Sequence, residues 1–367
     1  MRPQVGLNSK GVDEVPGDRR GWLAIRPSTS ERSGTARARS GVQPGPPRTS
    51  ILSIMIETTP TKPSGVHAVT PLPRVTASVL LLLALSACTS AAPLAVTEAQ
   101  SFRELLEVDE KLRGFEAYVP RATAGTTHSL ILAFHGSGGS GALFRAGSGL
   151  DTVADRQGAI VVYPDAAVGN WAEDCGCNVA DRLGVNDTAF VRLIIDTITA
   201  RFPVDPQRIY AVGFSQGGLF VHRLACQMAD RFVAVASIAS PMSAPLGQSC
   251  NSRAPVSVLV VLGTADAVFP WTGGGDWPLT VLGARETVDR WGTLLRCGGA
   301  WAREALPNRV ADGTSVWIDA ITSCNGRAMV ALAGVEGGRH SWHLSQDVAT
   351  QELVRRFFFE DVPVATE

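Results

Sequence analysis

The sequence predicts a single α/β domain built on a mostly parallel, doubly wound sheet. Short β-branched apolar runs alternate along the chain with longer segments whose apolar residues recur at helical spacing. Several runs, such as residues 256–262, are apolar on both faces, as is typical of central parallel strands covered by helices on each side. Because 45% of the 367 residues are hydrophobic, the chain can also bury a large core.

Eight strands and four helices are expected, in an order that contains no internal repeat and no linker to a second domain. The strands are expected at 115–119, 129–134, 159–163, 208–212, 232–238, 256–262, 316–318 and 329–335. The helices are expected at 187–201, 216–228, 279–295 and 346–358.

The formal net charge of −1 averages three unlike segments, which carry +5 over residues 1–54, +1 over 55–87 and −7 over 88–367. An acidic body of this size argues against nucleic acid or anionic lipid as its partner. Residues 1–54 are rich in Arg, Gly, Pro and Ser and have no apolar period. We interpret them as a disordered or mis-annotated extension, with Met55 as the true start.

A secretory signal is predicted at residues 55–87. Arg74 precedes an apolar run of about a dozen residues, short of the roughly 18 that span a bilayer. The following Leu85-Ser-Ala-Cys88 resembles the bacterial lipobox, so Cys88 is the expected lipidation site; cleavage near Ala92 is the alternative. We therefore expect export to the cell envelope or the extracellular space, with membrane contact only through a lipid anchor.

The mature chain is expected to have three parts: a tether at 88–108, the folded domain at 109–360 and a short tail at 361–367. Six cysteines remain after Cys88, an even number that suits disulfides in an oxidising compartment: Cys175, Cys177, Cys226, Cys250, Cys297 and Cys324. A zinc site is the competing interpretation, but Cys175-Gly-Cys177 lacks the usual two-residue spacer, so we expect no metal.

A nucleophilic serine is predicted at Ser215. Gly213-Phe-Ser215-Gln-Gly217 is the only G-x-S-x-G match in the chain, directly after one predicted strand and directly before a predicted helix. This strand-turn-helix setting holds a serine in a strained turn, and the flanking glycines avoid collisions with it. A glycine-rich turn with an incidental serine is the structural alternative.

The serine needs a base and an acid, which in this arrangement follow it in the order acid and then histidine. His340 lies in the loop after the strand at 329–335 and is the expected base, with His343 as the substitute. Asp266 follows the strand at 256–262 and is the expected acid. Asp276 and Asp319 are its substitutes, and His222 is expected to pack rather than to catalyse.

The oxyanion hole is expected to use the backbone N–H groups of Gln216 and Ser137, the latter in the loop after the strand at 129–134. The same loop also supports a dinucleotide-binding interpretation. Residues 136–141 satisfy G-x-G-x-x-G, and Asp165 could bind a ribose. That interpretation leaves the serine, acid and histidine unexplained, so we expect no cofactor.

With these residues placed, the body resembles the secreted esterases that include polyhydroxybutyrate depolymerase-like proteins and the feruloyl and acetylxylan esterases of carbohydrate esterase family one. The matching pieces are His135-Gly136, residues 161–165, Asn170-Trp171, the Cys175/Cys177 region with Asn186-Asp187, residues 213–218, 224–226 and 263–266 with Pro270, Trp291 with Cys297, and residues 338–342. The resemblance implies an α/β-hydrolase fold, the same three catalytic residues and a Cys297–Cys324 disulfide. The chain departs from the family pattern at Cys175-Gly-Cys177, Asn186-Asp187 and His343, all in loops around the site.

These observations predict a secreted serine esterase that acts on feruloyl or acetyl esters of plant polysaccharides, or on hydroxyalkanoate oligomers, through an acyl-enzyme. His135 and the loop tryptophans Trp171, Trp271, Trp277 and Trp342 are the expected substrate-binding residues, because aromatic faces suit phenolic acids, sugars and acyl chains. The alternatives are a peptidase or other acyl hydrolase on the same fold, and a cell-surface binding protein without turnover.

Overall fold

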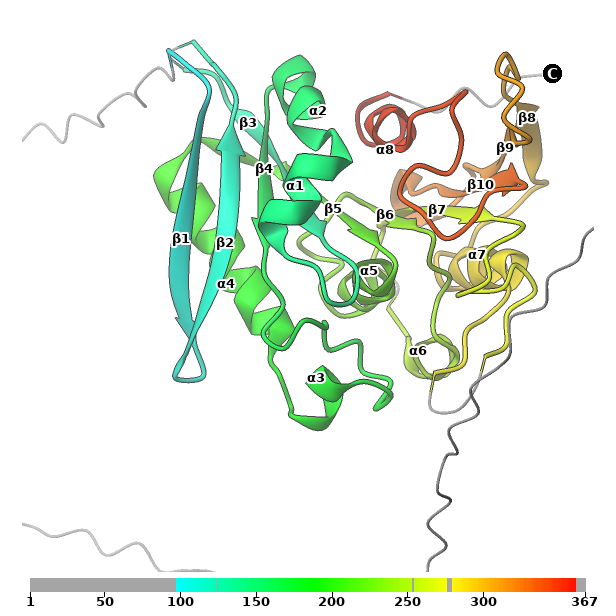
Figure 1. Ribbon diagram of the computed structural model, residues 1–367, viewed down its shortest axis with the longest axis horizontal. Helices are drawn as coiled ribbons and strands as arrows, with labels where there is room; N and C mark the ends of the chain where they lie inside the picture. Colours follow the sequence, from blue (N-terminus) through cyan, green and yellow to red (C-terminus); the bar gives the residue numbers. More distant parts are fainter. Residues whose placement is uncertain (1–96, 124, 253, 276–278, 361–367) are drawn as a thin grey trace, which may run out of the picture. The chain divides into compact units, whose positions relative to one another are not determined.

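Ten strands form one mixed sheet in the computed structural model, which describes residues 97–123, 125–252, 254–275 and 279–360. The order of hydrogen-bonded neighbours is β1-β2-β4-β3-β5-β6-β7-β10-β9-β8, with β1 at the left and β8 at the right of Figure 1. The strands are β1 (Gln100–Val108), β2 (Lys111–Val119), β3 (His128–Phe134), β4 (Ala159–Pro164), β5 (Val204–Phe214), β6 (Ala234–Ile238), β7 (Ser257–Gly263), β8 (Ala302–Ala305), β9 (Ser315–Ile321) and β10 (Val330–Glu336).

Six neighbouring strands, from β4 to β10 in the sheet order, are parallel, and antiparallel strands flank them on both sides. All eight expected strands form, and the predicted α/β class with a mostly parallel sheet is confirmed. Because β3, β5, β7 and β10 run parallel, their carboxyl ends lie at one edge of the sheet. Ligands bind at this edge in open α/β folds.

Helices cover both faces of the sheet. They are α1 (Gly141–Ser148), α2 (Leu150–Gln157), α3 (Val179–Arg182), α4 (Asp187–Arg201), α5 (Gln216–Gln227), α6 (Ala244–Ser249), α7 (Ala284–Leu294) and α8 (Thr350–Phe359), with a 3-10 turn at Asn325–Arg327. The four expected helices form, but α7 and α8 begin later than predicted. The short helices α1, α2, α3 and α6 were not predicted.

Strand residues alternate between two apolar cores, one on each face. Leu130, Leu132 and Phe134 of β3 belong to the core that also contains residues of α4, α5 and α7. The intervening Ile131 and Ala133 belong to the core on the other face, with residues of α1, α2 and α8. Both faces of the central strands are therefore buried from solvent, as their continuous apolar runs indicate.

The expected tether at residues 88–108 is wrong for its last nine residues, because Gln100–Val108 forms β1 and pairs with β2. Residues 1–96, which include the predicted leader and Cys88, and residues 361–367 lie outside the described part. Within the described ranges, no helix combines the length and the apolar character that a membrane span requires.

All six cysteines of the folded part are paired, as Cys175–Cys177, Cys226–Cys250 and Cys297–Cys324. The prediction of structural disulfides, and of the Cys297–Cys324 pair in particular, is confirmed. This last bond joins the chain after α7 to the connection between β9 and β10 across 27 residues of sequence.

Removing the Cys297–Cys324 bond by a double substitution to alanine is expected to lower the free energy of unfolding by about 3 kcal/mol, because the unfolded chain gains the entropy of an open loop. Urea unfolding under non-reducing conditions measures this change. Unaltered stability in the double variant would show that the bond contributes nothing to the fold.

Candidate active site

Ser215 lies at the sharp turn between β5 and α5. Its backbone has φ 54° and ψ −122°, a conformation that non-glycine residues rarely adopt. The Ser215 N–H donates to the Ile238 carbonyl of β6 at 2.9 Å, which anchors the turn to the neighbouring strand. The turn leaves the Ser215 side chain at the carboxyl edge of the sheet.

The glycines on either side of Ser215 are required by close backbone packing. A Cβ on Gly213 would collide with the Gly217 carbonyl, and a Cβ on Gly217 would collide with the carbonyls of Phe134 and His135. Glycine at 213 lets the turn close on Gly217, and glycine at 217 lets the turn pack against the end of β3. This is the physical basis of the G-x-S-x-G pattern here.

His340 connects Ser215 to Asp266 through two hydrogen bonds. Its Nε2 lies 2.8 Å from Ser215 Oγ, and its Nδ1 lies 2.8 Å from Asp266 Oδ2. A carboxylate at Nδ1 accepts the Nδ1–H, which leaves Nε2 as the acceptor that faces the serine hydroxyl. The three residues thus form a continuous Ser215–His340–Asp266 row.

The loop after β7 holds Asp266 in place. Its other oxygen, Oδ1, accepts the backbone N–H groups of Val268 at 2.8 Å and Phe269 at 2.9 Å. The Ala265 N–H donates to the Gly338 carbonyl at 2.9 Å, which ties the loop that carries the acid to the loop that carries His340. The acid and the histidine are therefore held by backbone contacts as well as by each other.

The rings of Phe214 and Phe269 flank the imidazole of His340, with centroids 5.4 and 5.5 Å from its own. Sequence reasoning did not single out either ring. Phe214 is the x of G-x-S-x-G and Phe269 follows Asp266 by three residues, so proximity to the predicted residues was the available signal.

The substitute residues lie elsewhere or are otherwise engaged. His343 is exposed, and Asp319 on β9 forms two hydrogen bonds to Arg303 at 2.6 and 2.7 Å. His222 is fully buried, accepts the indole N–H of Trp291 at 3.1 Å, and has its pKa lowered to about 4 by burial. Asp276 lies outside the described residues.

The two expected oxyanion donors belong to adjacent segments. Gln216 begins α5, so its N–H has no intrahelical partner. Gly136, next to Ser137, packs against the serine, since a Cβ there would lie 3.2 Å from Ser215 Cβ. Among the hydrogen bonds of the described residues, none uses the N–H of Ser137 or of Gln216.

Three of the five expected substrate-binding residues are buried, which corrects their predicted role. Trp171 and Trp342 donate their indole N–H groups to the carbonyls of His135 and Ser148. His135 is 2% exposed, its ring nitrogens contact Gly136 O and the Ala166 N–H, and burial lowers its pKa. These loops fold over the sheet edge, so their aromatic rings pack inward instead of facing a ligand.

Trp271 is half-buried against Trp317, with ring centroids 5.7 Å apart, and its substrate-binding role stays a prediction. Trp277 lies outside the described residues.

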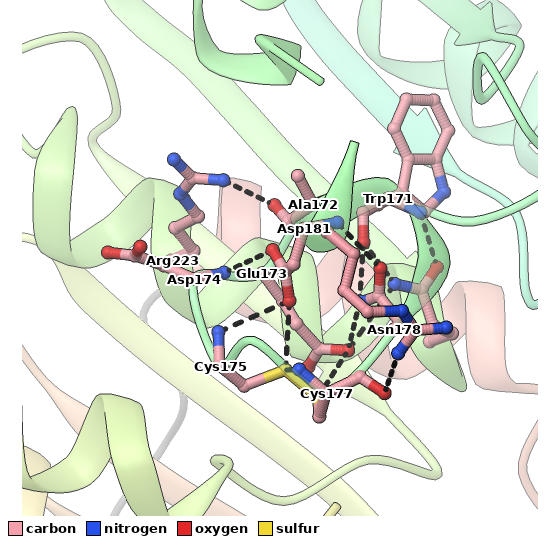
Figure 2. Close-up of a disulfide and its surroundings, with 11 residues drawn as sticks. Trp171, Ala172, Glu173, Asp174, Cys175, Cys177, Asn178, Asp181 and Arg223 are labelled. Atoms are coloured by element: carbon pink, nitrogen blue, oxygen red, sulfur yellow. Dashed lines mark hydrogen bonds between the residues drawn. A yellow bond between two sulfur atoms is a disulfide. The ribbon is translucent and has the colours of Figure 1, made fainter. Parts of the chain in front are cut away.

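Of the side chains that the structure describes, Glu173, Cys175 and Cys177 bring three potential metal-binding atoms within 4.8 Å. Both sulfurs are in the disulfide, however, which leaves the carboxylate alone (Figure 2).

Residues 114–257 match the family model described as esterase PHB depolymerase. Over these residues, which are less than half of the chain, the sequence is similar to that family. The matched segment runs from β2 to the start of β7 and contains Ser215, Ser137 and Gln216, whereas Asp266 and His340 follow it.

Curated relatives of this chain carry esterase names. A putative esterase NocK of Nocardia uniformis subsp. tsuyamanensis is 31% identical over 58% of this chain and 65% of its own length. Feruloyl esterase B of Piromyces equi is 31% identical over 58% of this chain and 39% of its own length. The chain therefore spans less than two thirds of either relative.

Among solved structures, an acetyl xylan esterase from Aspergillus awamori is similar at 14% identity, with a TM-score of 0.49, over 70% of this chain and 99% of its own.

The contacts of Asp165, the acid expected to bind a ribose, do not support the dinucleotide-binding interpretation. Asp165 accepts hydrogen bonds from the Gly141 N–H and from Arg103, so both of its oxygens are engaged.

Proposed function

We propose that this chain is a serine esterase that cleaves carboxylic esters through an acyl-enzyme on Ser215. The observation that carries the proposal is the hydrogen-bonded Ser215–His340–Asp266 row at the strained turn after β5. The esterase family match and the esterase names of the relatives support the same activity.

In the first half of the proposed reaction, Ser215 Oγ attacks the carbonyl carbon of the ester while His340 Nε2 takes the hydroxyl proton. The carbonyl oxygen becomes an oxyanion and is stabilised by the N–H groups of Gln216 and Ser137. Asp266 accepts the Nδ1–H and stabilises the imidazolium. His340 then gives its proton to the leaving alkoxide, and the C–O bond breaks.

In the second half, water attacks the acyl-serine carbonyl, and His340 takes the water's proton and returns it to Ser215 Oγ. The carboxylic acid leaves and the free enzyme is restored. Every proton moves through the Nε2 atom of His340, which lies within hydrogen-bond distance of Ser215 Oγ.

The proposed substrates are feruloyl or acetyl esters of plant polysaccharides or hydroxyalkanoate oligomers. Relatives named feruloyl esterase and acetylxylan esterase support the polysaccharide esters, and the family name supports the oligomers. We further propose that the protein is exported and anchored through Cys88. Three disulfides in the folded part support an oxidising compartment.

The purified protein is expected to release p-nitrophenol from its acetate and butyrate esters and to leave the matching p-nitroanilides intact. A panel of methyl ferulate, acetylated xylan and 3-hydroxybutyrate oligomers then identifies the acyl group with the highest kcat/KM. Cleavage of the anilides at rates similar to the esters would favour the peptidase alternative. No cleavage of any ester would favour a binding protein without turnover.

A further inference from the structure

We propose that Glu173 is a positioning residue for the esterase reaction. In its neutral form it holds the Gln216 side chain, and through it the 169–171 segment, so that the two oxyanion donors keep their spacing. This inference rests on the proposed function and adds a pH-sensitive group outside the Ser215–His340–Asp266 row.

The 169–171 segment joins the two loops that carry the oxyanion donors. Toward the loop after β3, the Gly169 carbonyl accepts the Gly138 N–H at 2.8 Å, and Asn170 Oδ1 accepts the Ser137 hydroxyl at 2.8 Å. The Trp171 indole donates to the His135 carbonyl at 2.9 Å. The segment is thus bonded to His135, Ser137 and Gly138 of the loop that carries the Ser137 N–H.

On the side of the turn after β5, the same segment forms two hydrogen bonds with the Gln216 side chain. The Trp171 N–H donates to Gln216 Oε1 at 2.8 Å, and Gln216 Nε2 donates back to the Trp171 carbonyl. Gln216 is therefore fixed from both ends of its amide. Because the backbone N–H of this residue is the second oxyanion donor, a shift of the 169–171 segment would move both donors.

Glu173 joins this hydrogen-bond network through its contacts with Gln216 and Asn178. Its Oε1 accepts Asn178 Nδ2 at 3.0 Å and Gln216 Nε2 at 3.5 Å, and Asn178 Nδ2 also donates to the Trp171 carbonyl at 3.1 Å (Figure 2). The Cys175–Cys177 disulfide closes the loop two residues later. Asp181 Oδ1 and Oδ2 accept the N–H groups of Asp174 and Cys175, which fastens this loop to α3.

The surroundings of Glu173 favour its neutral form. The side chain is 1% exposed, and Oε2 has no hydrogen-bond partner among the described residues. An uncompensated charge costs far more to bury than a neutral carboxylic acid. The pKa of Glu173 is raised from its usual 4.5 to about 8. Burial is the largest cause and nearby Asp181 acts in the same direction, whereas Asn178, Gln216 and Arg223 of α5 act to lower the pKa.

Above this pKa the charge gains solvation by leaving its buried position. The hydrogen bonds that link Glu173 to Gln216 and Asn178 then break, and the oxyanion donors lose their alignment. Small misplacements of this kind lower kcat more than they alter KM, because the oxyanion forms only in the transition state.

Three variants of the full chain test this role with p-nitrophenyl butyrate between pH 6 and pH 10. Glu173→Ala is expected to lower kcat by about 10- to 100-fold with less than about a threefold change in KM. Glu173→Gln, a neutral isostere, is expected to restore kcat. It is also expected to abolish the loss of kcat that we predict for the wild type near pH 8. Glu107→Ala, an exposed residue on β1, is the control and should follow the wild-type profile.

Thermal unfolding gives a readout that does not depend on activity. Between pH 4.5 and about 8 the folded state keeps a proton on Glu173 that the unfolded state releases, so the raised pKa makes wild-type stability fall as pH rises through this window. The difference in Tm between the wild type and Glu173→Gln should therefore change across the window and become constant above it.

The proposal would be overturned by wild-type kcat in Glu173→Ala or by an alkaline loss that persists in Glu173→Gln. It would also be overturned by a Tm difference that does not change with pH. If Glu173→Ala does not fold, the pH profile of Glu173→Gln decides. Absence of Ser215-dependent ester cleavage in the wild type would instead refute the proposed function, and the Tm comparison would still report on Glu173.

Discussion

Replacing Ser215 with alanine is expected to lower kcat for p-nitrophenyl butyrate by about 10⁴-fold or more, because the acyl-enzyme can no longer form. The residual rate would come from the oxyanion donors and from substrate binding alone. Steady-state kinetics at pH 8, with enough enzyme to measure the slow rate, check the effect.

The fold of this variant should be unchanged, since alanine adds no atom to the turn after β5. Ser249→Ala, at an exposed position in α6, is the matched control and should keep the wild-type kcat. A Ser215→Ala protein that retains more than about a tenth of the wild-type kcat would contradict the assignment of the nucleophile, because loss of a serine nucleophile costs far more.

Asp266→Asn is expected to lower kcat by about 10⁴-fold with little change in stability. The Asn Oδ1 can still accept the N–H groups of Val268 and Phe269, so its amide nitrogen would face His340 Nδ1. That nitrogen donates, and it therefore selects the tautomer that carries its proton on Nε2. A protonated Nε2 cannot take the proton of Ser215.

The control for this substitution is Asp319→Asn, because Asp319 is the substitute acid that lies within the described residues. Asp319 pairs with Arg303 at the far edge of the sheet, so its loss should leave kcat within about twofold and affect only stability, by up to about 1 kcal/mol. Equal losses of kcat in both variants would indicate a general effect of removing carboxylates rather than a specific role of Asp266.

Strands with fully buried residues could be predicted from the sequence. The two strands that were not predicted, β1 and β8, are only partly buried. The run in β7 is apolar on both faces, whereas β1 alternates exposed and half-buried residues at the sheet edge. The hairpin after β1 uses Asp109 and Glu110, both at positive φ, in place of the Asn-Gly pair that usually signals such a turn. The four-residue β8 is too short to show a period.

The residues of the Ser215–His340–Asp266 row could be predicted because chain order and strand ends fix which loops meet. The direction of a side chain within a loop follows no such rule. Trp171 and Trp342 lie in the expected loops, yet each turns inward because its indole N–H finds a buried carbonyl. Glu173 was missed for the same reason, since nothing in its local sequence marks a carboxyl group as buried.

The most direct test of the account is covalent labelling of the purified protein with diethyl p-nitrophenyl phosphate, followed by peptide mass spectrometry. A nucleophilic serine displaces p-nitrophenolate and keeps the diethylphosphoryl group. We expect one adduct per chain on the peptide that contains Ser215, loss of esterase activity in step with labelling, and no adduct in Ser215→Ala. Full inactivation with the Ser215 peptide unmodified, or an adduct on a different serine, would contradict it.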